Sequence, residues 1–376
     1  MMNCNKNTVF CLFFLIIASV SLFSRALERP DYVKNEKRIF FEAQEEFDRH
    51  NYGDSLSLLE QAKKVRRNKI AWEIYTLENS LKPAEVKRVG NNLNDILRVL
   101  QDRQDYDAIE IIHRYAEFYG LETFDYSAPK LLEFIRGRSY FPEADYLSGQ
   151  IYKIEGEYEV AKKLFLQAYE RRSILDVPEM EFDILYSLSD ISLTMKEYDK
   201  YEEFLVAIVS SDRFYNDKAL LRSMMRTISS TDADGMERFF KMYRANDYKV
   251  MSAYFYLSEF YQQRNEKKRS LDVAALGVLT AVSKIYSALS KRNPECSYTN
   301  LADFLDEAAL YEDIVLWGQT TGVWKGFNDF AESAYNNGCE TFAMKLYEVL
   351  KDHSPEYYWK TDASIRYNTI VEKANN

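Results

Sequence analysis

The residues that most often carry chemistry are few and scattered in this chain of 376 residues. Its 3 histidines are His50, His113 and His353, and none forms the i, i+4 pair with which a helix holds a metal ion. Residues 42–49 are rich in carboxylates, but this density is typical of the solvent-facing side of an amphipathic helix. We predict no catalytic, metal-binding or cofactor-binding site, and we expect His113 to face the core of a helix pair.

The motifs of the common nucleotide-binding and hydrolytic enzymes are also absent from the sequence. It contains no GxGxxG, no GxxxxGK[ST] and no GxSxG. We therefore predict a protein that is not an enzyme, with an enzyme of unrecognised kind as an alternative.

The charge balance argues against nucleic acid and anionic lipid as partners, because the formal net charge is −10. One basic cluster stands out, and we interpret it as the solvated end of a helix, where cations suit the helix dipole. The cluster consists of Lys63, Lys64, Arg66, Arg67 and Lys69.

The elements that would position any site are predicted to be helices. Only 12 Gly and 7 Pro occur, whereas hairpins and tight loops need many such residues, and 47% of the residues are hydrophobic. This composition indicates an all-α fold with short connections between its helices.

The first residues have the pattern of a signal peptide, which we assign to residues 1–26. Lys6 precedes an apolar run over residues 9–23, and Ser24-Arg25-Ala26 offers a small-x-small cleavage site. We expect an exported protein in the periplasm or another extracytoplasmic space, with an uncleaved membrane anchor as the alternative. Cys296 and Cys339 would remain after cleavage, either as a disulfide or as two buried thiols.

Residues 142–173 carry the clearest repeat pattern. Gly149 and Ala161 are small enough to let two helices cross closely, and Phe165 would fill the space beside the crossing. Gly156 suits the turn between the helices. The segment resembles the tetratricopeptide repeat family, whose unit is two antiparallel helices over about 34 residues.

A second good copy begins near residue 327 and includes Gly338. Weaker copies begin near residues 41, 96, 186 and 254, and Tyr201 stands in one of them where the family prefers Ala. The copies are unevenly spaced, so we predict extra helices at residues 67–81 and 128–139. The resemblance implies an all-α, tetratricopeptide-like α-solenoid of antiparallel helix pairs. We divide it into N-terminal repeats at residues 27–230 and continuous C-terminal repeats at residues 231–376.

By this resemblance, the first helix of each pair lines a concave face that binds a partner. The residues expected on this face are Tyr146, Gln150, Tyr186, Asp190, Phe255 and Glu259.

The resemblance implies a non-enzymatic scaffold or adaptor for other proteins of the cell envelope, as in secretion, pilus or flagellar-motor complexes. Membrane proximity would come through that complex or an uncleaved anchor, and the sequence leaves the oligomeric state open. The alternative function is a ligand-binding module for a small molecule or glycan that serves a transporter.

The first prediction concerns export. If residues 1–26 are a signal peptide, the mature protein begins at Leu27, and replacing Ala26 with a bulky residue blocks cleavage. Mass spectrometry of the purified protein measures its N-terminus. A chain that retains its apolar run in the cell would contradict the prediction and support the anchor.

Overall fold

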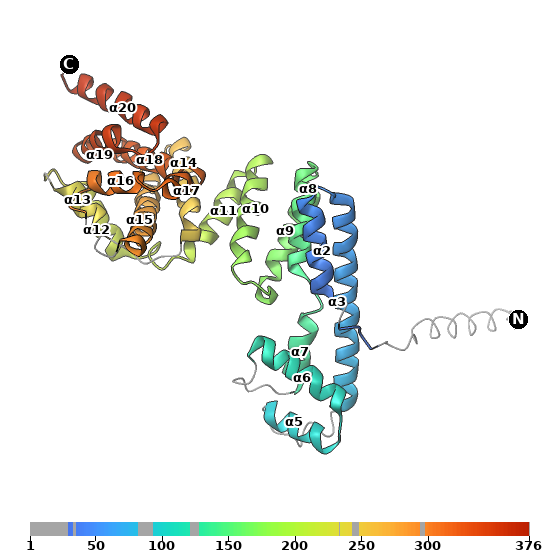
Figure 1. Cartoon of the computed structure of the whole chain (residues 1–376). Helices are drawn as coiled ribbons and strands as arrows, with labels where there is room; N and C mark the ends of the chain where they lie inside the picture. The colour runs from blue at the N-terminus through green and yellow to red at the C-terminus, as the bar shows by residue number, and fades with distance from the viewer. Residues whose placement is uncertain are drawn as a thin grey trace, which may run out of the picture. The chain divides into compact units, whose positions relative to one another are not determined.

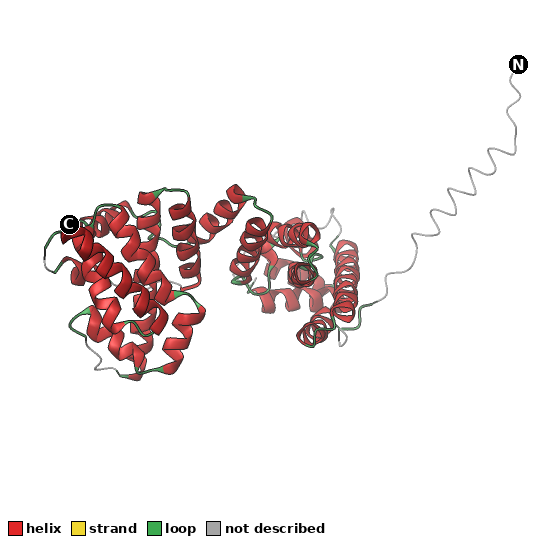
Figure 2. Ribbon diagram, turned by 90° about the horizontal axis from the view of Figure 1, so that it is seen from above, coloured by secondary structure: helices red, strands yellow, loops and turns green. Residues whose placement is uncertain are grey.

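The computed structural model describes residues 29–32, 35–81, 93–120, 128–232, 234–242, 248–293 and 298–375. All regular secondary structure in these ranges is helical (Figure 2), as the composition predicts. The predicted signal peptide and Cys296 lie outside the described residues. The chain divides between Pro178 and Glu179 into two compact units, here called unit 1 and unit 2. The domain boundary expected at residues 230 and 231 stays a prediction.

Unit 1 contains two pairs of neighbouring helices, α2 with α3 and α8 with α9, and α3 also packs against α8 (Figure 1). Helices α6 and α7 pack against α3 as well, and α5 packs against α6. The helices of unit 1 are α2 (Glu36–Asp48), α3 (Tyr52–Ser80), α5 (Leu93–Asp102), α6 (Tyr106–Tyr119), α7 (Ala128–Gly137), α8 (Pro142–Ile154) and α9 (Tyr158–Glu170), followed by the 3₁₀ turn η2 (Arg172–Ile174).

Helix α3 is one uninterrupted helix of 29 residues. The prediction of a separate helix at residues 67–81 is therefore wrong, because no Gly or Pro interrupts the helix between Gly53 and Leu81. The predicted extra helix at residues 128–139 is confirmed as α7. The basic cluster consequently lies in the middle of α3 and not at a helix end.

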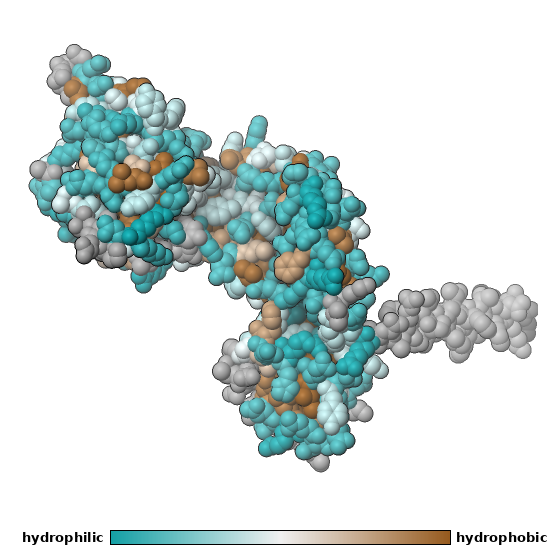
Figure 3. All heavy atoms as spheres, viewed as in Figure 1, coloured by the Kyte–Doolittle hydropathy of each residue, from teal (hydrophilic) through white to brown (hydrophobic). Residues whose placement is uncertain are grey.

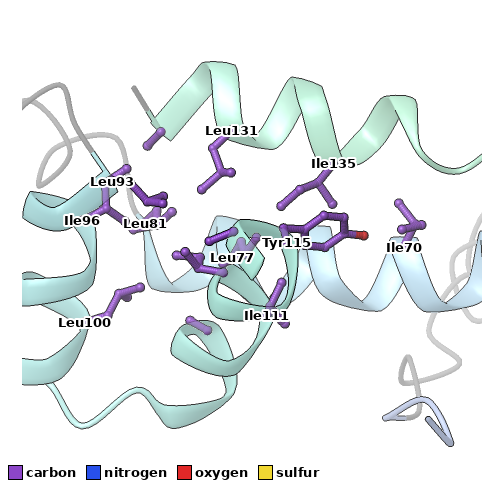
Figure 4. Close-up of a cluster of buried hydrophobic side chains, with 14 of the residues drawn as sticks. Ile70, Leu77, Leu81, Leu93, Ile96, Leu100, Ile111, Tyr115, Leu131 and Ile135 are labelled. Atoms are coloured by element: carbon purple, nitrogen blue, oxygen red, sulfur yellow. The ribbon is translucent and has the colours of Figure 1, made fainter. Parts of the chain in front are cut away.

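The two halves of α3 belong to two different hydrophobic cores. Near its beginning, Leu59 and Ala62 are buried with Ile39 of α2 and Leu147 of α8. Toward its end, the side chains point to those of α5, α6 and α7 (Figure 4). This second core includes Ile70, Leu77, Leu93, Ile96, Ile111, Tyr115, Leu131 and Ile135.

Unit 2 repeats the arrangement of sequential pairs: α10 packs with α11, α14 with α15, α18 with α19, and α19 with α20. The second helix of one pair also packs against the first helix of the next, as α11 does on α14 and α15 on α18. The helices of unit 2 are α10 (Met180–Thr194), α11 (Tyr198–Ser210), α12 (Lys218–Ile228), α13 (Gly235–Phe240), the 3₁₀ turn η3 (Tyr248–Val250), α14 (Met251–Gln263), α15 (Lys267–Arg292), α16 (Leu301–Ala309), α17 (Glu312–Thr320), α18 (Val323–Asn336), α19 (Glu340–His353) and α20 (Tyr357–Asn375).

Helix α15 is long and apolar enough to cross a membrane by length and composition alone. However, 67% of its apolar stretch is buried inside unit 2. The surrounding helices therefore cover most of it, as they cover the core helix of a globular unit.

The same backbone turn joins the two helices of each predicted repeat. The residue after the first helix's cap has a left-handed φ, between 58° and 82°. The next N–H then donates to a carbonyl of the last helical turn, as Glu157 N does to Tyr152 O at 2.8 Å. These are the marks of a Schellman cap, which satisfies the free carbonyls of the helix end. The left-handed residues are His50, Gln104, Gly156, Lys196, Asn265 and Gly338.

The helix crossings follow the predicted use of small residues. A Cβ atom on Gly149 would come within 2.5 Å of the Phe165 ring, so the ring occupies the space that a side chain would need. In other pairs, small residues that include a serine meet at the equivalent position. Ser55 Oγ donates to Ala43 O at 2.8 Å, and Ser270 Oγ donates to the carbonyl of Ser258 at 3.1 Å.

Tyr201, the bulky residue where the family prefers Ala, packs between two pairs. Its ring lies edge-on to Phe260 of α14, with centroids 5.3 Å apart, and it is buried. The larger side chain therefore fills the seam between α11 and α14 and does not prevent their contact.

The second prediction tests the left-handed turns. A non-glycine residue at such a φ costs about 1–2 kcal/mol, of which the greater freedom of glycine in the unfolded chain offsets a part. Lys196→Gly should therefore raise the free energy of unfolding by about 0.5–1 kcal/mol, as measured by urea denaturation.

Glu203→Gly is the matched control, because Glu203 is an exposed residue inside α11 of the same pair. This change should lower the free energy of unfolding by about 1 kcal/mol. Equal destabilisation by both changes would contradict the assignment of the turn.

Candidate partner-binding face

The predicted partner-binding residues lie on the first helices of their pairs. Tyr186 and Asp190 are one turn apart on α10, and Phe255 and Glu259 are one turn apart on α14. Because α10 and α14 belong to unit 2 and α14 packs against α18, we describe these three helices together as the α10/α14/α18 face. Tyr146 and Gln150 lie on α8 of unit 1 and are described separately.

Tyr186 connects α10 to the beginning of α14. Its hydroxyl donates to Lys249 O at 2.6 Å and accepts from Ala253 N at 3.1 Å. The bond from Ala253 satisfies an N–H of the first turn of α14, which has no partner within its own helix. Tyr186 therefore positions α14, in addition to any contact that its ring could make with a partner.

Three exposed side chains of this face lie near Tyr201 of α11. Asp190, Tyr256 and Glu259 are all exposed, and Tyr256 keeps 48% of its surface accessible. Burial raises the pKa of the Tyr201 hydroxyl, and the nearby Glu259 and Asp190 carboxylates raise it further. The rings of Tyr186 and Tyr256 pack edge-on, with their centroids 6.4 Å apart. The structure thus brings together two acidic residues and an exposed aromatic ring from two helices.

Phe255 is placed mainly for packing. A Cβ on Gly326 of α18 would come within 2.5 Å of its ring, and one on Gly277 of α15 within 2.8 Å. Phe255 is partly buried, so its ring lies in the junction of α14, α15 and α18. Only part of its surface is available to a partner.

Helix α18 adds two charged residues that the sequence-based selection omitted. Lys325 Nζ lies 3.1 Å from Glu259 Oε2 and 2.6 Å from Asp329 Oδ2. Burial raises the pKa of Asp329, and Lys325 opposes this rise. Lys325 therefore stabilises the ionised form of a largely buried carboxylate beside the exposed Glu259.

On α8 in unit 1, Tyr146 and Gln150 are both partly buried. The Tyr146 ring lies 5.5 Å from that of Phe165, centroid to centroid, so it belongs to the contact between α8 and α9. Both residues remain candidates for partner contact through their exposed surface.

Sequence reasoning missed Tyr256, Lys325 and Asp329. The signals for them were available: Tyr256 follows the selected Phe255, and Lys325 and Asp329 have the i, i+4 spacing of a helical ion pair. They were missed because the apolar pattern of a helix predicts which of its faces is buried. The pattern does not predict which residues of other helices lie beside its exposed face.

The histidines lie at separate places in the described part of the chain. His50 occupies the turn between α2 and α3, and His353 ends α19 with Nδ1 2.9 Å from Asp306 Oδ2. His113 is exposed on α6, so the expectation that it faces the core is wrong. The apolar face of α6 instead uses Ile111, Ile112 and Tyr115. Among the described residues, no group of three or more His, Cys, Asp or Glu side chains is placed to hold a metal ion.

The geometry defines the class of this protein: it is an all-α protein built from sequential, paired helices. No protein-family model matches the chain. It is homologous to uncharacterised proteins of spirochetes. Over 333 residues it is 29% identical to one from Treponema pallidum (strain Nichols), an alignment that covers 88% of each chain. It is 23% identical over 273 residues to one from Borreliella burgdorferi (strain ATCC 35210 / DSM 4680 / CIP 102532 / B31), covering 65% of this chain and 83% of that one.

The third prediction concerns the ion pair of α18. Lys325→Met leaves the Asp329 carboxylate without its cation, and the free energy of unfolding should fall by about 1–2 kcal/mol. This is less than for a fully buried pair, because Lys325 is 38% exposed. A group with a raised folded-state pKa favours the folded state at low pH and loses this effect as pH rises. The defect should therefore shrink between pH 7 and pH 5.

The control is the double variant Lys325→Met with Asp329→Asn, in which neither position of the pair carries a charge. Its stability should depend less on pH than that of Lys325→Met. Urea denaturation at several pH values measures both. A defect of Lys325→Met that is the same at every pH would show that the Asp329 charge is not its cause.

Proposed function

We propose that this protein is a non-enzymatic, tetratricopeptide-like scaffold that binds another protein of the cell envelope. The observation that carries the proposal is the recurrence of one helix–turn–helix unit, with the same left-handed turn, at each of the predicted repeats. Stacking such units produces an α-solenoid, whose first helices line an extended surface for a partner.

The α10/α14/α18 face is the proposed contact surface in unit 2. It presents the exposed ring of Tyr256 beside the carboxylates of Asp190 and Glu259. Aromatic side chains provide large contact areas at low entropic cost, and the Asp190 carboxylate favours a partner segment that carries Lys or Arg, whereas Glu259 also pairs with Lys325. The side of the molecule seen in Figure 3 is largely hydrophilic with scattered hydrophobic patches.

The place of action that we propose is the periplasm or an equivalent extracytoplasmic space, as part of a secretion, pilus or flagellar-motor complex. The signal-like sequence of residues 1–26 supports export. The choice of complex rests on analogy with other exported tetratricopeptide proteins.

The fourth prediction tests the contact surface with a photo-crosslinking amino acid at position 256, introduced in the cells that make the protein. We expect a discrete protein adduct, identified by mass spectrometry, because Tyr256 lies at the centre of the proposed face. Asp190→Lys should weaken that adduct by reversing a charge on the same face.

The matched control carries the crosslinker at Tyr106, a tyrosine on α6 of unit 1 that is 70% exposed and therefore at least as accessible as Tyr256. It should not capture the same protein. No protein adduct at position 256, or the same adducts at both positions, would overturn the scaffold proposal for this face.

A further inference from the structure

A cavity of about 390 Å³ with charged residues in its wall lies in unit 1, where α2, α3 and α6 come together. It shares no residue with the α10/α14/α18 face, and its volume falls within the range of roughly 300–1,000 Å³ for small-molecule sites. The cationic side chains that line it are Lys37, Arg66, Lys69, Arg114 and Arg138. Two of them, Arg66 and Lys69, belong to the basic cluster that the sequence interpretation placed in solvent. That interpretation is wrong for both residues, because their side chains turn inward from the middle of α3.

Two buried arginines in this wall have unused donors. Arg66 is 3% exposed; its Nε donates to Arg138 O at 2.8 Å, and its guanidinium lies 4.4 Å from the centre of the Phe141 ring. Its Nη1 has no hydrogen-bond partner among the described residues. Arg138 is 8% exposed and donates from Nη1 to Ile174 O at 3.2 Å, while its Nε lacks a partner there. A buried, charged donor without an acceptor is costly, so this wall is suited to an acceptor from a ligand.

One buried carboxylate in the wall has an unused acceptor. Glu36 is 3% exposed and forms an ion pair with Lys69 through Oε1. Its Oε2 has no hydrogen-bond partner in the described part of the chain. The cavity therefore offers donors from Arg66 and Arg138 together with an acceptor from Glu36.

The remaining charges near the cavity have partners. Arg114 pairs with Glu73 at 2.8 Å, and Lys37 pairs with Asp176 at 3.2 Å. Glu143 and Asp176 are not among the lining residues, although each has one unpartnered oxygen. Burial raises the pKa of Glu73 and of Glu143, and for Glu73 the hydrogen bond from Tyr115 and the charges of Lys69 and Arg114 oppose the rise. Arg66 and Arg138 are therefore the donors left for an anion.

The aromatic side chains complete the walls and limit the size of the ligand. Tyr32, Phe118 and Tyr119 line the cavity, and Tyr115 contributes the polar edge of the second core of unit 1 (Figure 4). Tyr115 is itself used, since its hydroxyl donates to Glu73 Oε2 at 2.7 Å. The volume of about 390 Å³ suits a compact organic molecule.

We propose that this cavity binds a free amino acid or a dipeptide. Its carboxylate would accept hydrogen bonds from Arg66 and Arg138, and its ammonium group would donate to Glu36. This activity goes beyond the scaffold function and does not depend on it, because it uses unit 1 alone.

The fifth prediction is tested by calorimetric titration of the purified protein with the common L-amino acids, their dipeptides and the corresponding deaminated acids. We expect saturable binding of at least one amino acid or dipeptide, at one site per chain. Its deaminated acid should bind at least tenfold more weakly, because Glu36 then has no donor to accept from. Arg66→Met should weaken the same binding at least tenfold.

Arg136→Met is the matched control, since Arg136 is an arginine of the same unit whose side chain is 60% exposed and does not line the cavity. It should bind like the unaltered protein. If circular dichroism shows that Arg66→Met does not fold, Glu36→Gln provides the second test: it should reduce the preference for the amino acid over its deaminated acid.

Three further results would overturn the proposal. One is the absence of saturable binding by every amino acid and dipeptide in the set. Another is binding of inorganic phosphate alone, which would make the cavity a site for an adventitious ion only. Equal binding by Arg66→Met and Arg136→Met would also exclude the cavity as the site.

Discussion

Each of the six helix pairs that correspond to the predicted repeats depends on a tight turn that reverses the chain within a few residues. The turn requires one residue with a left-handed backbone, followed by an N–H that caps the preceding helix. Because the turn allows so little freedom, the second helix must fold back along the first, and the positions where they cross are thereby set. Gly149 beside Phe165 and Ser55 beside Ala43 illustrate the result: the two helices approach closely wherever those positions are small or can share a hydrogen bond.

Four of the six turns place a side chain at this unfavourable position, in His50, Gln104, Lys196 and Asn265. The strain is tolerated because the cap and the packing of the pair outweigh it. It also explains why the repeats are hard to see in sequence, since only Gly156 and Gly338 carry the residue type that marks such a turn. A turn defined by backbone conformation can recur while the residues that form it vary.

The two units use polar side chains in different ways. On the α10/α14/α18 face, Tyr186 bonds to backbone groups at the start of α14, Lys325 pairs with Asp329, and exposed groups remain at the surface. In unit 1, the length of α3 brings charged residues from its middle between two hydrophobic cores. There Arg66 and Glu36 are buried without using all of their hydrogen-bonding atoms. The first arrangement favours contact with a large partner, and the second favours a small ligand.

The sequence by itself determined the helical class, the pairing of helices around Gly149 and Ala161, and the turns at Gly156 and Gly338. These follow from short-range effects, namely the period of the apolar residues and the backbone freedom of glycine. Only the tertiary structure decided that α3 runs uninterrupted, that Arg66 is buried, that His113 is exposed and that Tyr201 fills a seam. Each of these depends on which other helix packs against a given helix face. That other helix is formed by residues distant in the sequence.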